Sequence, residues 1–318
     1  MYLERSGLSL QIPPVDLLQG QTMFKKSVKS AQNWFVISSL PIILIVFFVF
    51  AILPLVFSLY LSSTRFSLVL NRSDFVGISN FIKAFTDPRF LNGSKNSLLY
   101  IIYFLPISLI LSLGLAIAVN SITKFKGFYR LIYFLPPITS TVAASLIFRF
   151  VYDRNAGLLN QIIHLFNQNL SLAWLTDKNL ALISIAILAI WQETGWNMVI
   201  FLAGLQGIPA EYYEVAQIDG ANRWQVLWLV TWPLLRSTFL FILITATIGA
   251  AQVFTPVYVM TRGGPSPYRT ETLVYYIYNV GFRNYELGYA ATMSVLLFIP
   301  LLIMAIIQYR FFQARWEY

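Results

Sequence analysis

The chain has 318 residues, of which 58% are hydrophobic and 11% are charged, and its mean hydropathy is +0.67. An ordinary soluble domain carries about 25% charged residues, so this composition excludes a water-soluble globule and indicates a membrane protein with several spans. The net charge of +9 comes from scattered basic residues, which favours loop charge that orients a membrane protein over a nucleic-acid partner. The chain has no cysteine, which excludes disulfides, thiolate metal sites and thiol catalysis.

The first 33 residues mix polar and apolar types and include a lysine cluster between positions 25 and 29. They lack the short apolar core and the small-residue cleavage site of a secretory signal. The sequence therefore predicts a cytoplasmic N-terminal arm at residues 1–33 and a single membrane domain at residues 34–318.

Six apolar runs are long enough to cross a bilayer, whose hydrocarbon core needs about 20 helical residues. The sequence predicts an all-α membrane protein with six transmembrane helices, at residues 35–61, 98–120, 131–152, 180–204, 237–260 and 287–309. The third run contains Pro136, Pro137 and Arg149, and the fourth contains several polar side chains. Because polar groups are costly against lipid, we expect these two spans to face protein or a cavity.

An even number of spans places both termini on one side of the membrane. Basic residues abut span ends at positions 25–29 and 124–130, where the positive-inside rule has its force. We therefore expect cytoplasmic N- and C-termini, with outer loops at residues 62–97, 153–179 and 261–286. The spacing at 157–163 predicts a helix within the second outer loop.

The middle of the fourth span concentrates hydrogen-bonding and flat aromatic groups. These are Trp191, Gln192, Glu193, Trp196 and Asn197. A charged carboxylate at mid-bilayer costs about 2.5–3.5 kcal/mol on insertion scales, so we expect Glu193 to be paired, protonated or open to water. Either it bonds a Ser, Thr or Tyr of a neighbouring span, or it lines a cavity for a polar solute such as a sugar.

The fifth span carries Thr245, Thr247, Gly249 and Gln252. Small and weakly polar residues fit either a solute cavity or close packing between membrane helices. Arg149, near the outer end of the third span, is expected to reach the membrane interface with its long side chain.

A polar loop at residues 209–221 separates the fourth and fifth hydrophobic segments. Its acids and its apolar spacing fit a short amphipathic helix that is broken at a glycine. Such a helix either seats in a groove of a soluble partner or lies in the membrane interface. The candidate contact residues are Glu211, Glu214, Val215, Ala216, Asp219 and Gly220.

We expect no catalytic residue, metal or cofactor in this chain. It has no Gly-x-x-x-x-Gly-Lys-Ser/Thr loop, so any ATP must be hydrolysed by a partner. The single histidine, His164, has no second ligand at metal spacing and is expected to be solvated or locally packed.

The polar loop resembles the cytoplasmic signature of binding-protein-dependent ABC importer permeases. Glu214-Val215-Ala216 stands where that family has Glu-Ala-Ala, and residues 218–221 and Pro233 fall at the family's spacing. The resemblance continues through nearly all of residues 35–318. Segments 75–81, 134–136 and 202–209 resemble the carbohydrate-type branch, and residues 261–265 with 270–272 are similar to its larger maltose- and glycerol-3-phosphate-type partner.

The resemblance implies a type I importer fold with a cytoplasmic coupling helix between spans four and five, in a prokaryotic inner membrane. It implies a second, homologous permease subunit, two ATPase subunits that bind ATP and Mg, and an extracytoplasmic solute-binding protein as partners besides lipid. A sugar, an oligosaccharide, a glycosylated osmolyte and glycerol phosphate all remain candidate solutes, and a sugar-type solute is favoured over glycerol-3-phosphate because no Lys or Arg falls mid-span to meet a phosphate.

The resemblance places solute-facing residues on spans four and five. The amide side chains of Asn197 and Gln252 are added because they can bond solute hydroxyls. Together the candidates are Gln192, Glu193, Trp196, Asn197, Ala246, Ala250 and Gln252. Ala246 and Ala250 stand where the maltose-type pattern has polar residues, so we do not expect maltose to bind in the same pose.

Two other classes of protein remain as alternatives. An ion- or proton-coupled secondary transporter would use Glu193 as its carrier, although no inverted hydropathy repeat stands out. An intramembrane enzyme is weakened by the missing nucleophile and metal motifs. Co-purification with an ATPase would separate the importer from both.

Overall fold

The computed structural model describes residues 39–67, 72–122 and 124–312, so the N-terminal arm expected at 1–33 lies outside the described residues. The chain divides into a unit that ends at Phe57 and a unit that begins at Ser58. The first unit contains the π-helical turn η1 (Phe48–Ile52) and the start of α2 (Leu53–Ser62). Its described side chains are half-buried or exposed and mostly apolar, which suits a surface covered by lipid or protein.

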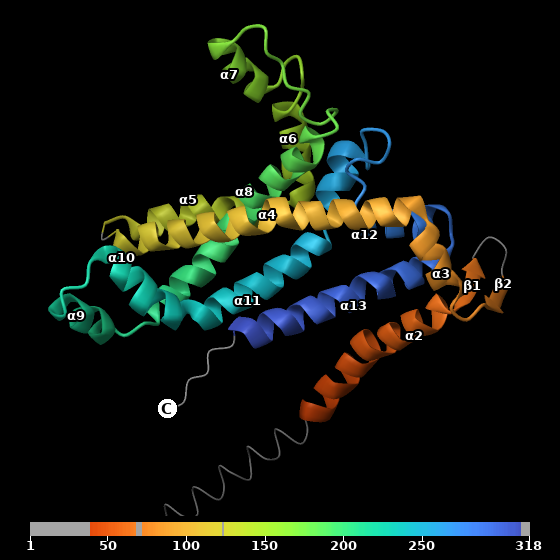
Figure 1. The fold of residues 1–318 in the computed structure, drawn as a ribbon, viewed down its shortest axis with the longest axis horizontal. Coiled ribbons are helices and arrows are strands. Elements are labelled where there is room, and N and C mark those ends of the chain that lie inside the picture. The colour runs from red at the N-terminus through yellow and green to blue at the C-terminus, as the bar shows by residue number, and fades with distance from the viewer. Residues whose placement is uncertain (1–38, 68–71, 123, 313–318) are drawn as a thin grey trace, which may run out of the picture. The chain divides into compact units, whose positions relative to one another are not determined.

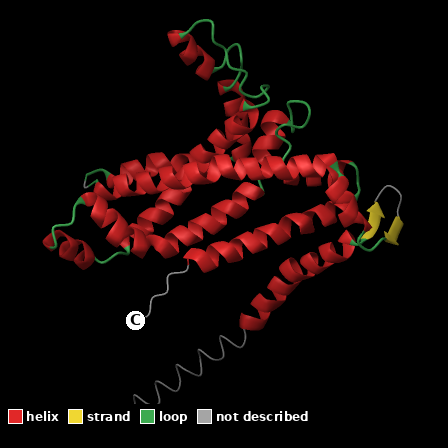
Figure 2. Ribbon diagram, in the orientation of Figure 1, coloured by secondary structure: helices red, strands yellow, loops and turns green. Residues whose placement is uncertain are grey.

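The second unit is mostly helical, with one small hairpin in which β1 pairs antiparallel with β2 (Figures 1 and 2). Its strands and helices, in chain order, are β1 (Thr64–Ser67), β2 (Arg72–Phe75), α3 (Ser79–Thr86), α4 (Pro88–Ser121), α5 (Lys126–Ile138), α6 (Thr141–Val151), α7 (Leu158–Phe166), α8 (Leu180–Gln206), α9 (Ala210–Ile218), α10 (Arg223–Val226), α11 (Trp232–Ala251), α12 (Leu273–Tyr278) and α13 (Leu287–Phe312). Three π-helical segments interrupt the C-terminal half, namely η2 (Leu227–Thr231), η3 (Val257–Thr261) and η4 (Asn279–Arg283). The helix expected at 157–163 is present as α7.

Five helices among the described residues are long and apolar enough to cross a membrane, and there are up to six spans if the bent pair α5 and α6 counts as one. The five are Ser39–Ser62, Pro88–Ser121, Leu180–Gln206, Arg223–Ala251 and Leu287–Phe312. This agrees with a membrane protein of several helical spans.

The third expected span is wrong as a continuous helix. The chain bends by 92° between α5 and α6, at Thr139 and Ser140. Pro136 and Pro137 lie in the last turn of α5 and weaken it, because neither has a backbone N–H to donate to the preceding turn. Thr139 closes the end of α5 by donating its hydroxyl to the Pro136 carbonyl at 2.6 Å.

The fifth expected span is displaced along the chain. The helix runs over Arg223–Ala251, whereas the apolar run at 237–260 predicted a later start and a later end. Apolar residues continue after Ala251, but the backbone turns there and Pro256 cannot donate a helical hydrogen bond. The helix of the second span also begins earlier than expected, at Pro88. Its first turns are polar, so the apolar run in the sequence did not include them.

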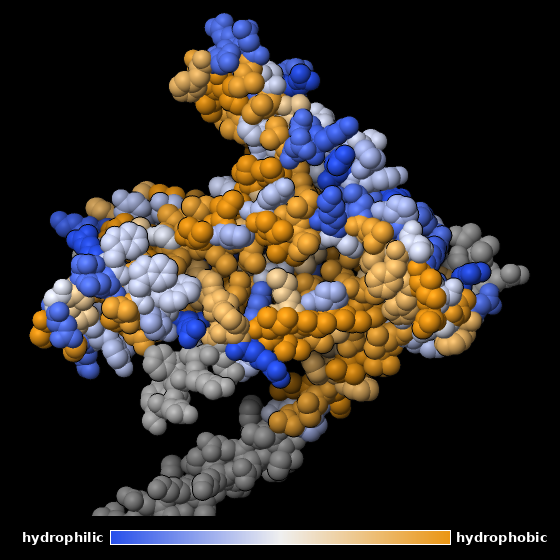
Figure 3. All heavy atoms as spheres, in the orientation of Figure 1, coloured by the Kyte–Doolittle hydropathy of each residue, from blue (hydrophilic) through white to orange (hydrophobic). Residues whose placement is uncertain are grey.

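Helices α4, α8 and α11 pack together around one core of apolar side chains, and the most extensive contact is between α4 and α8. Fully buried members include Ile185, Met198, Phe201 and Ile242. A second apolar cluster joins the start of α4 to α3, α12 and α13. On the face of the molecule drawn in Figure 3, hydrophobic side chains cover the middle, and hydrophilic side chains gather over α9 and α10 and over α7.

Candidate functional site

A cavity of about 350 Å³ lies among α4, α8, α11 and the segment that follows α11. Both polar stretches that the sequence singled out, on spans four and five, open onto it. Its lining includes all seven predicted solute-facing residues, namely Gln192, Glu193, Trp196, Asn197, Ala246, Ala250 and Gln252. The structure thus brings these residues together, and their role in a solute pathway stays a prediction.

Glu193 is the one charged side chain of this lining, and no Lys or Arg accompanies it. Within the described residues its carboxylate has no hydrogen bond or ion pair, so of the two alternatives the structure shows the cavity lining and not the bond to a neighbouring Ser, Thr or Tyr. A second hollow of about 260 Å³ also reaches Glu193 and Trp196. The carboxylate therefore faces open space at the depth where lipid would make it costly.

Gln192 lies beside the bend between α5 and α6. Its amide Nε2 donates to the Thr139 carbonyl at 3.2 Å and lies 3.4 Å from the Thr139 hydroxyl. At a bend within a membrane, backbone N–H and C=O groups that leave the helix need hydrogen-bond partners from the protein. Gln192 supplies such a partner for the Thr139 carbonyl. This side chain therefore supports the wall of the cavity as well as lining it.

Two further predicted residues are held by neighbouring helices. Asn197 is buried and donates to the Ser108 hydroxyl of α4 at 3.5 Å. Trp196 stacks on Phe134 of α5, with ring centroids 6.0 Å apart. Thr247, from the polar tract of the fifth span, turns away from the cavity and accepts from Gln308 of α13 at 3.0 Å. Part of the tract therefore lines the cavity and part of it packs against α13.

Sequence reasoning identified Trp196 but missed three other aromatic residues of the lining. Tyr100 and Phe104 of α4 and Phe254 after α11 complete the wall, and the first two stack with centroids 5.9 Å apart. In the sequence these rings are indistinguishable from ordinary apolar span residues. Helix-face periodicity in α4 was the one available signal, because Tyr100 and Phe104 are four residues apart.

Gly195 is the second omission. A methyl group at this position would overlap the Tyr133 carbonyl oxygen and press on Pro137. Since Pro137 has no N–H for the Tyr133 carbonyl, α5 and α8 approach closely at this point, as small residues permit in membrane helices. Gly195 therefore sets the distance between the two helices that form one side of the cavity.

Helix α9 occupies the polar loop and ends just before Gly220, as the spacing predicted. Its open face carries four exposed predicted contact residues, namely Glu211, Glu214, Val215 and Asp219. Ala216 is buried against its own chain, so this residue seats α9 rather than extending the open face. Gly220 has φ of +73° and open space around its Cα, so it is required by backbone conformation rather than by a contact.

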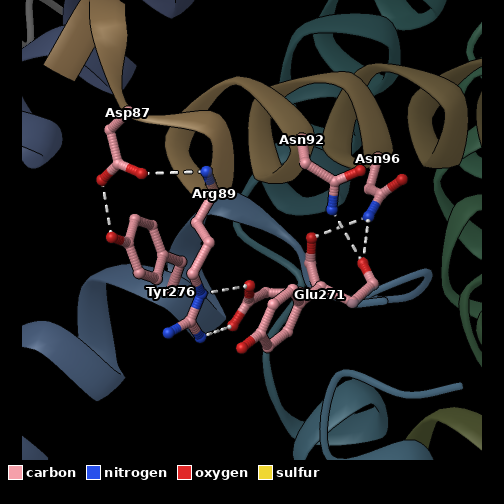
Figure 4. A network of polar contacts seen from close by, with 7 residues as sticks. Asp87, Arg89, Asn92, Asn96, Glu271 and Tyr276 are labelled. Atoms are coloured by element: carbon pink, nitrogen blue, oxygen red, sulfur yellow. Dashed lines mark hydrogen bonds and ion pairs between the residues drawn. The ribbon is translucent and has the colours of Figure 1, made fainter. Parts of the chain in front are cut away.

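A network of buried and half-buried polar side chains, the Glu271 network, joins the N-terminal end of α4 to the segment between η3 and α12 (Figure 4). The Glu271 side chain is 1% exposed and binds Arg89 through two contacts, at 2.6 and 3.1 Å. The Arg89 guanidinium also lies over the rings of Tyr268 and Tyr276, at 4.2 and 4.6 Å from their centroids. The charge of Glu271 is therefore fully matched.

Asp87 forms the other half of this network. It caps α4 by accepting from the Arg89 backbone N–H at 2.9 Å and accepts from the hydroxyls of Tyr276 and Tyr289 at 2.6 and 2.7 Å. Burial raises the pKa of Asp87, but these hydrogen bonds outweigh it and hold the pKa below its ordinary value. Asp87 therefore stays ionised while it ties α4 to α12 and α13.

The remaining candidates are local in their contacts. His164 Nε2 lies 2.9 Å from the Ser171 hydroxyl, which agrees with the expected local packing. Within residues 39–67, 72–122 and 124–312, no group of three or more potential metal ligands occurs. The Arg149 side chain reaches the Val259 carbonyl at 3.4 Å.

Comparison with known proteins adds a family, several relatives and a fold. The model of the family described as "Binding-protein-dependent transport system inner membrane component" matches residues 125–318. The lactose transport system permease protein LacF of Rhizobium radiobacter is 33% identical over 91% of this chain and 96% of its own. The osmoprotective compounds uptake permease protein GgtC of Synechocystis is 35% identical over 76% and 87%.

The sn-glycerol-3-phosphate transport system permease protein UgpA of Agrobacterium fabrum is 33% identical over 82% of this chain and 88% of its own. Among solved structures, a chain of the bacterial alginate ABC transporter, crystallised in complex with an alginate pentasaccharide-bound periplasmic protein, has the same fold. The TM-score is 0.77 at 20% identity, covering 92% of this chain and 99% of that one.

Proposed function

The chain belongs to the family of binding-protein-dependent transport system inner membrane components, and we propose that it is one permease subunit of an ABC importer for a sugar-like solute. In this proposal it pairs with a second, homologous permease and forms half of the pathway through the membrane. The solute moves inward by alternating access, and this chain carries out no chemistry on it.

The observation that carries the proposal is the shared cavity of the seven predicted solute-facing residues. Its volume falls within the range of about 300–1,000 Å³ of small-molecule sites. Aromatic faces from Trp196 and Phe254 suit the apolar faces of a sugar ring, and the amides and the carboxylate suit its hydroxyls.

The chemistry of the lining favours a neutral solute. The cavity holds Glu193 and no cationic side chain, so a phosphate or a uronate would meet repulsion without a compensating charge. Relatives named for lactose and for osmoprotective compounds fit this better than the relative named for glycerol-3-phosphate. We therefore propose a neutral saccharide or glycosylated osmolyte.

ATP hydrolysis is assigned to partners. We propose that two ATPase subunits bind ATP and Mg and contact the open face of α9, so that their closure moves the spans attached to it. Glu211, Glu214, Val215 and Asp219 would make this contact, with Ala216 and Gly220 shaping the helix and its end. This chain binds no cofactor.

The proposal also fixes an orientation and a site of solute delivery. Six spans, with α5 and α6 as one bent span, would leave both termini in the cytoplasm and α9 on the cytoplasmic side. An extracytoplasmic solute-binding protein would then deliver the solute to the opposite face. The arm at 1–33 has no role in this scheme.

The deciding experiment is ATPase activity of the complex purified through this chain and reconstituted in lipid, with and without solute-loaded binding proteins. Stimulation by one loaded binding protein supports the importer and identifies the solute. A solitary protein that transports solute without any ATPase would support the alternative, an ion- or proton-coupled carrier that uses Glu193.

The coupling assignment has its own test. Glu214→Ala removes an acid from the open face of α9, and Gly220→Pro forces a backbone with φ near about −65° where the chain has +73°. Both variants should assemble but lose ATP-dependent uptake, while Glu286→Ala, far from α9 in the sequence and exposed, should not. Normal uptake by both α9 variants at equal expression would overturn the assignment.

A further inference from the structure

A second large cavity, of about 520 Å³, lies on the opposite side of α9 from its open face. It collects residues from the last turns of α4, the end of α8, the inner face of α9, and the helix that leads into α11. The lining residues used below are Asn120, Tyr213, Gln217, Arg223 and Thr231. The solute pathway does not use this cavity.

The charge of this lining differs from that of the solute cavity. Arg223 is its cation, and no Asp or Glu contributes to it. Among the described residues no ion pair or hydrogen bond occupies the Arg223 guanidinium, whose five N–H groups are therefore available. The acids of α9 point elsewhere, because Tyr213 and Gln217 share one face of the helix whereas Glu211 and Glu214 occupy another.

The neutral side chains of the lining also offer donors. The Asn120 carboxamide oxygen accepts from Lys126 Nζ at 3.2 Å, which leaves the NH₂ group of this lining residue as a donor. The Tyr213 hydroxyl accepts from Thr231 at 3.4 Å, so its own proton is available to a ligand. A guanidinium with surrounding N–H and O–H donors and no carboxylate is a site for an anion with several oxygens, such as phosphate.

The location indicates where that phosphate comes from. The lining lies at the ends of candidate spans Pro88–Ser121 and Leu180–Gln206 and at the start of Arg223–Ala251, which is the depth of lipid headgroups. On the neighbouring face of the same helix, Trp224 and Trp228 are 70% and 57% exposed. Indole rings are enriched at this membrane–water interface.

We propose that this cavity binds the phosphate of an anionic phospholipid headgroup, through Arg223 with Asn120 and Tyr213. The lipid phosphate then connects α9 to the ends of three spans. If α9 also transmits the motion of the ATPase subunits, which rests on the proposed function, the lipid adjusts that transmission.

Binding is tested on the full chain, in the assembly in which it is purified, in nanodiscs of phosphatidylcholine with increasing phosphatidylglycerol. The thermal unfolding midpoint and the phosphatidylglycerol retained after washing are measured together. The wild type should be stabilised as phosphatidylglycerol increases. Arg223→Gln should need about tenfold more of this lipid, the loss expected of one charge-assisted hydrogen bond, and Arg223→Lys should fall between the two.

Arg236→Gln is the matched control, because Arg236 lies on the same helix and outside the cavity. It should titrate like the wild type. Equal responses of Arg223→Gln and the wild type, or an equal loss in Arg236→Gln, would contradict the site. Stabilisation by inorganic phosphate in phosphatidylcholine discs, matching that by phosphatidylglycerol, would assign a soluble anion and overturn the lipid proposal. None of these readouts depends on transport, so failure here is distinguishable from failure of the importer assignment.

Discussion

The carboxylates of Glu193 and Glu271 differ in their surroundings. Glu271 is buried, paired with Arg89 through two contacts and covered by aromatic rings. Glu193 faces a cavity and has no partner among the described side chains. Removing one partner of a buried ion pair destabilises a fold strongly. An unpaired carboxylate at membrane depth is instead typical of a site that contacts a solute or an ion. The comparison separates a structural region around Glu271 from the proposed working region, the solute cavity around Glu193.

The largest expected effect comes from displacing the wall of the proposed working region. Gly195→Val would force α5 away from α8, because its side chain would overlap the Tyr133 carbonyl. Overpacking costs about 1–3 kcal/mol or more, and we expect solute uptake to fall by more than about tenfold. Gly114→Ala is the control, since a methyl group there meets nothing within 4 Å. Normal uptake by Gly195→Val would show that the spacing of α5 and α8 is not needed.

Breaking the structural region should affect stability. Glu271→Gln leaves Arg89 without its partner, and because Arg89 is partly exposed we expect a loss of about 2–4 kcal/mol in unfolding free energy. The exposed pair of Lys83 and Glu286, at 3.5 Å, gives the control Glu286→Gln, with about 0–1 kcal/mol. Thermal unfolding in lipid discs measures both. Equal midpoints for the two variants would refute the contrast.

Glu193→Gln should show the reverse pattern. The unfolding midpoint should stay the same or rise, because no partner is lost and a costly carboxylate is removed from membrane depth. Uptake efficiency should fall by about tenfold, the value of one hydrogen bond from a charged group to a solute hydroxyl. Uptake assays in proteoliposomes test this. A stability loss as large as that of Glu271→Gln would mean that Glu193 is structural.

The smallest expected effect depends on pH. Because the pKa of Asp87 is lowered in the folded chain, its contribution to stability is complete above the unfolded pKa of about 3.9 and is lost as the pH falls through the lower folded value. The unfolding midpoint of the wild type should therefore exceed that of Asp87→Asn above about pH 4. The difference should shrink below that pH. A constant difference would exclude ionised Asp87 as the cause.

The sequence predicted the working region better than the structural one. A carboxylate or amide inside an apolar run is conspicuous, so Gln192, Glu193 and Asn197 were identified before any fold was known. Arg89 and Glu271 lie 182 positions apart, and each falls in a polar segment where charge is ordinary. Their pairing needed the three-dimensional arrangement of α4 and the segment before α12.

Span boundaries were predicted less well than spans. Hydropathy continues past Ala251 through residues 253–260, although the helix stops there. The two prolines indicated that the helix of the third span could be interrupted, but they did not predict a bend of 92°. That angle depends on contacts made elsewhere, including the hydrogen bond from Gln192 to the Thr139 carbonyl.

The bend between α5 and α6 also bears on how the protein is made. The two arms have 13 and 11 residues, and neither alone reaches the length of about 20 that a bilayer requires. A broken helix is stable at membrane depth only where protein satisfies its free backbone groups, and Gln192 is synthesised after the bend. The third span should therefore remain beside the insertion machinery until α8 has been translated, so that the two segments enter the bilayer as a pair.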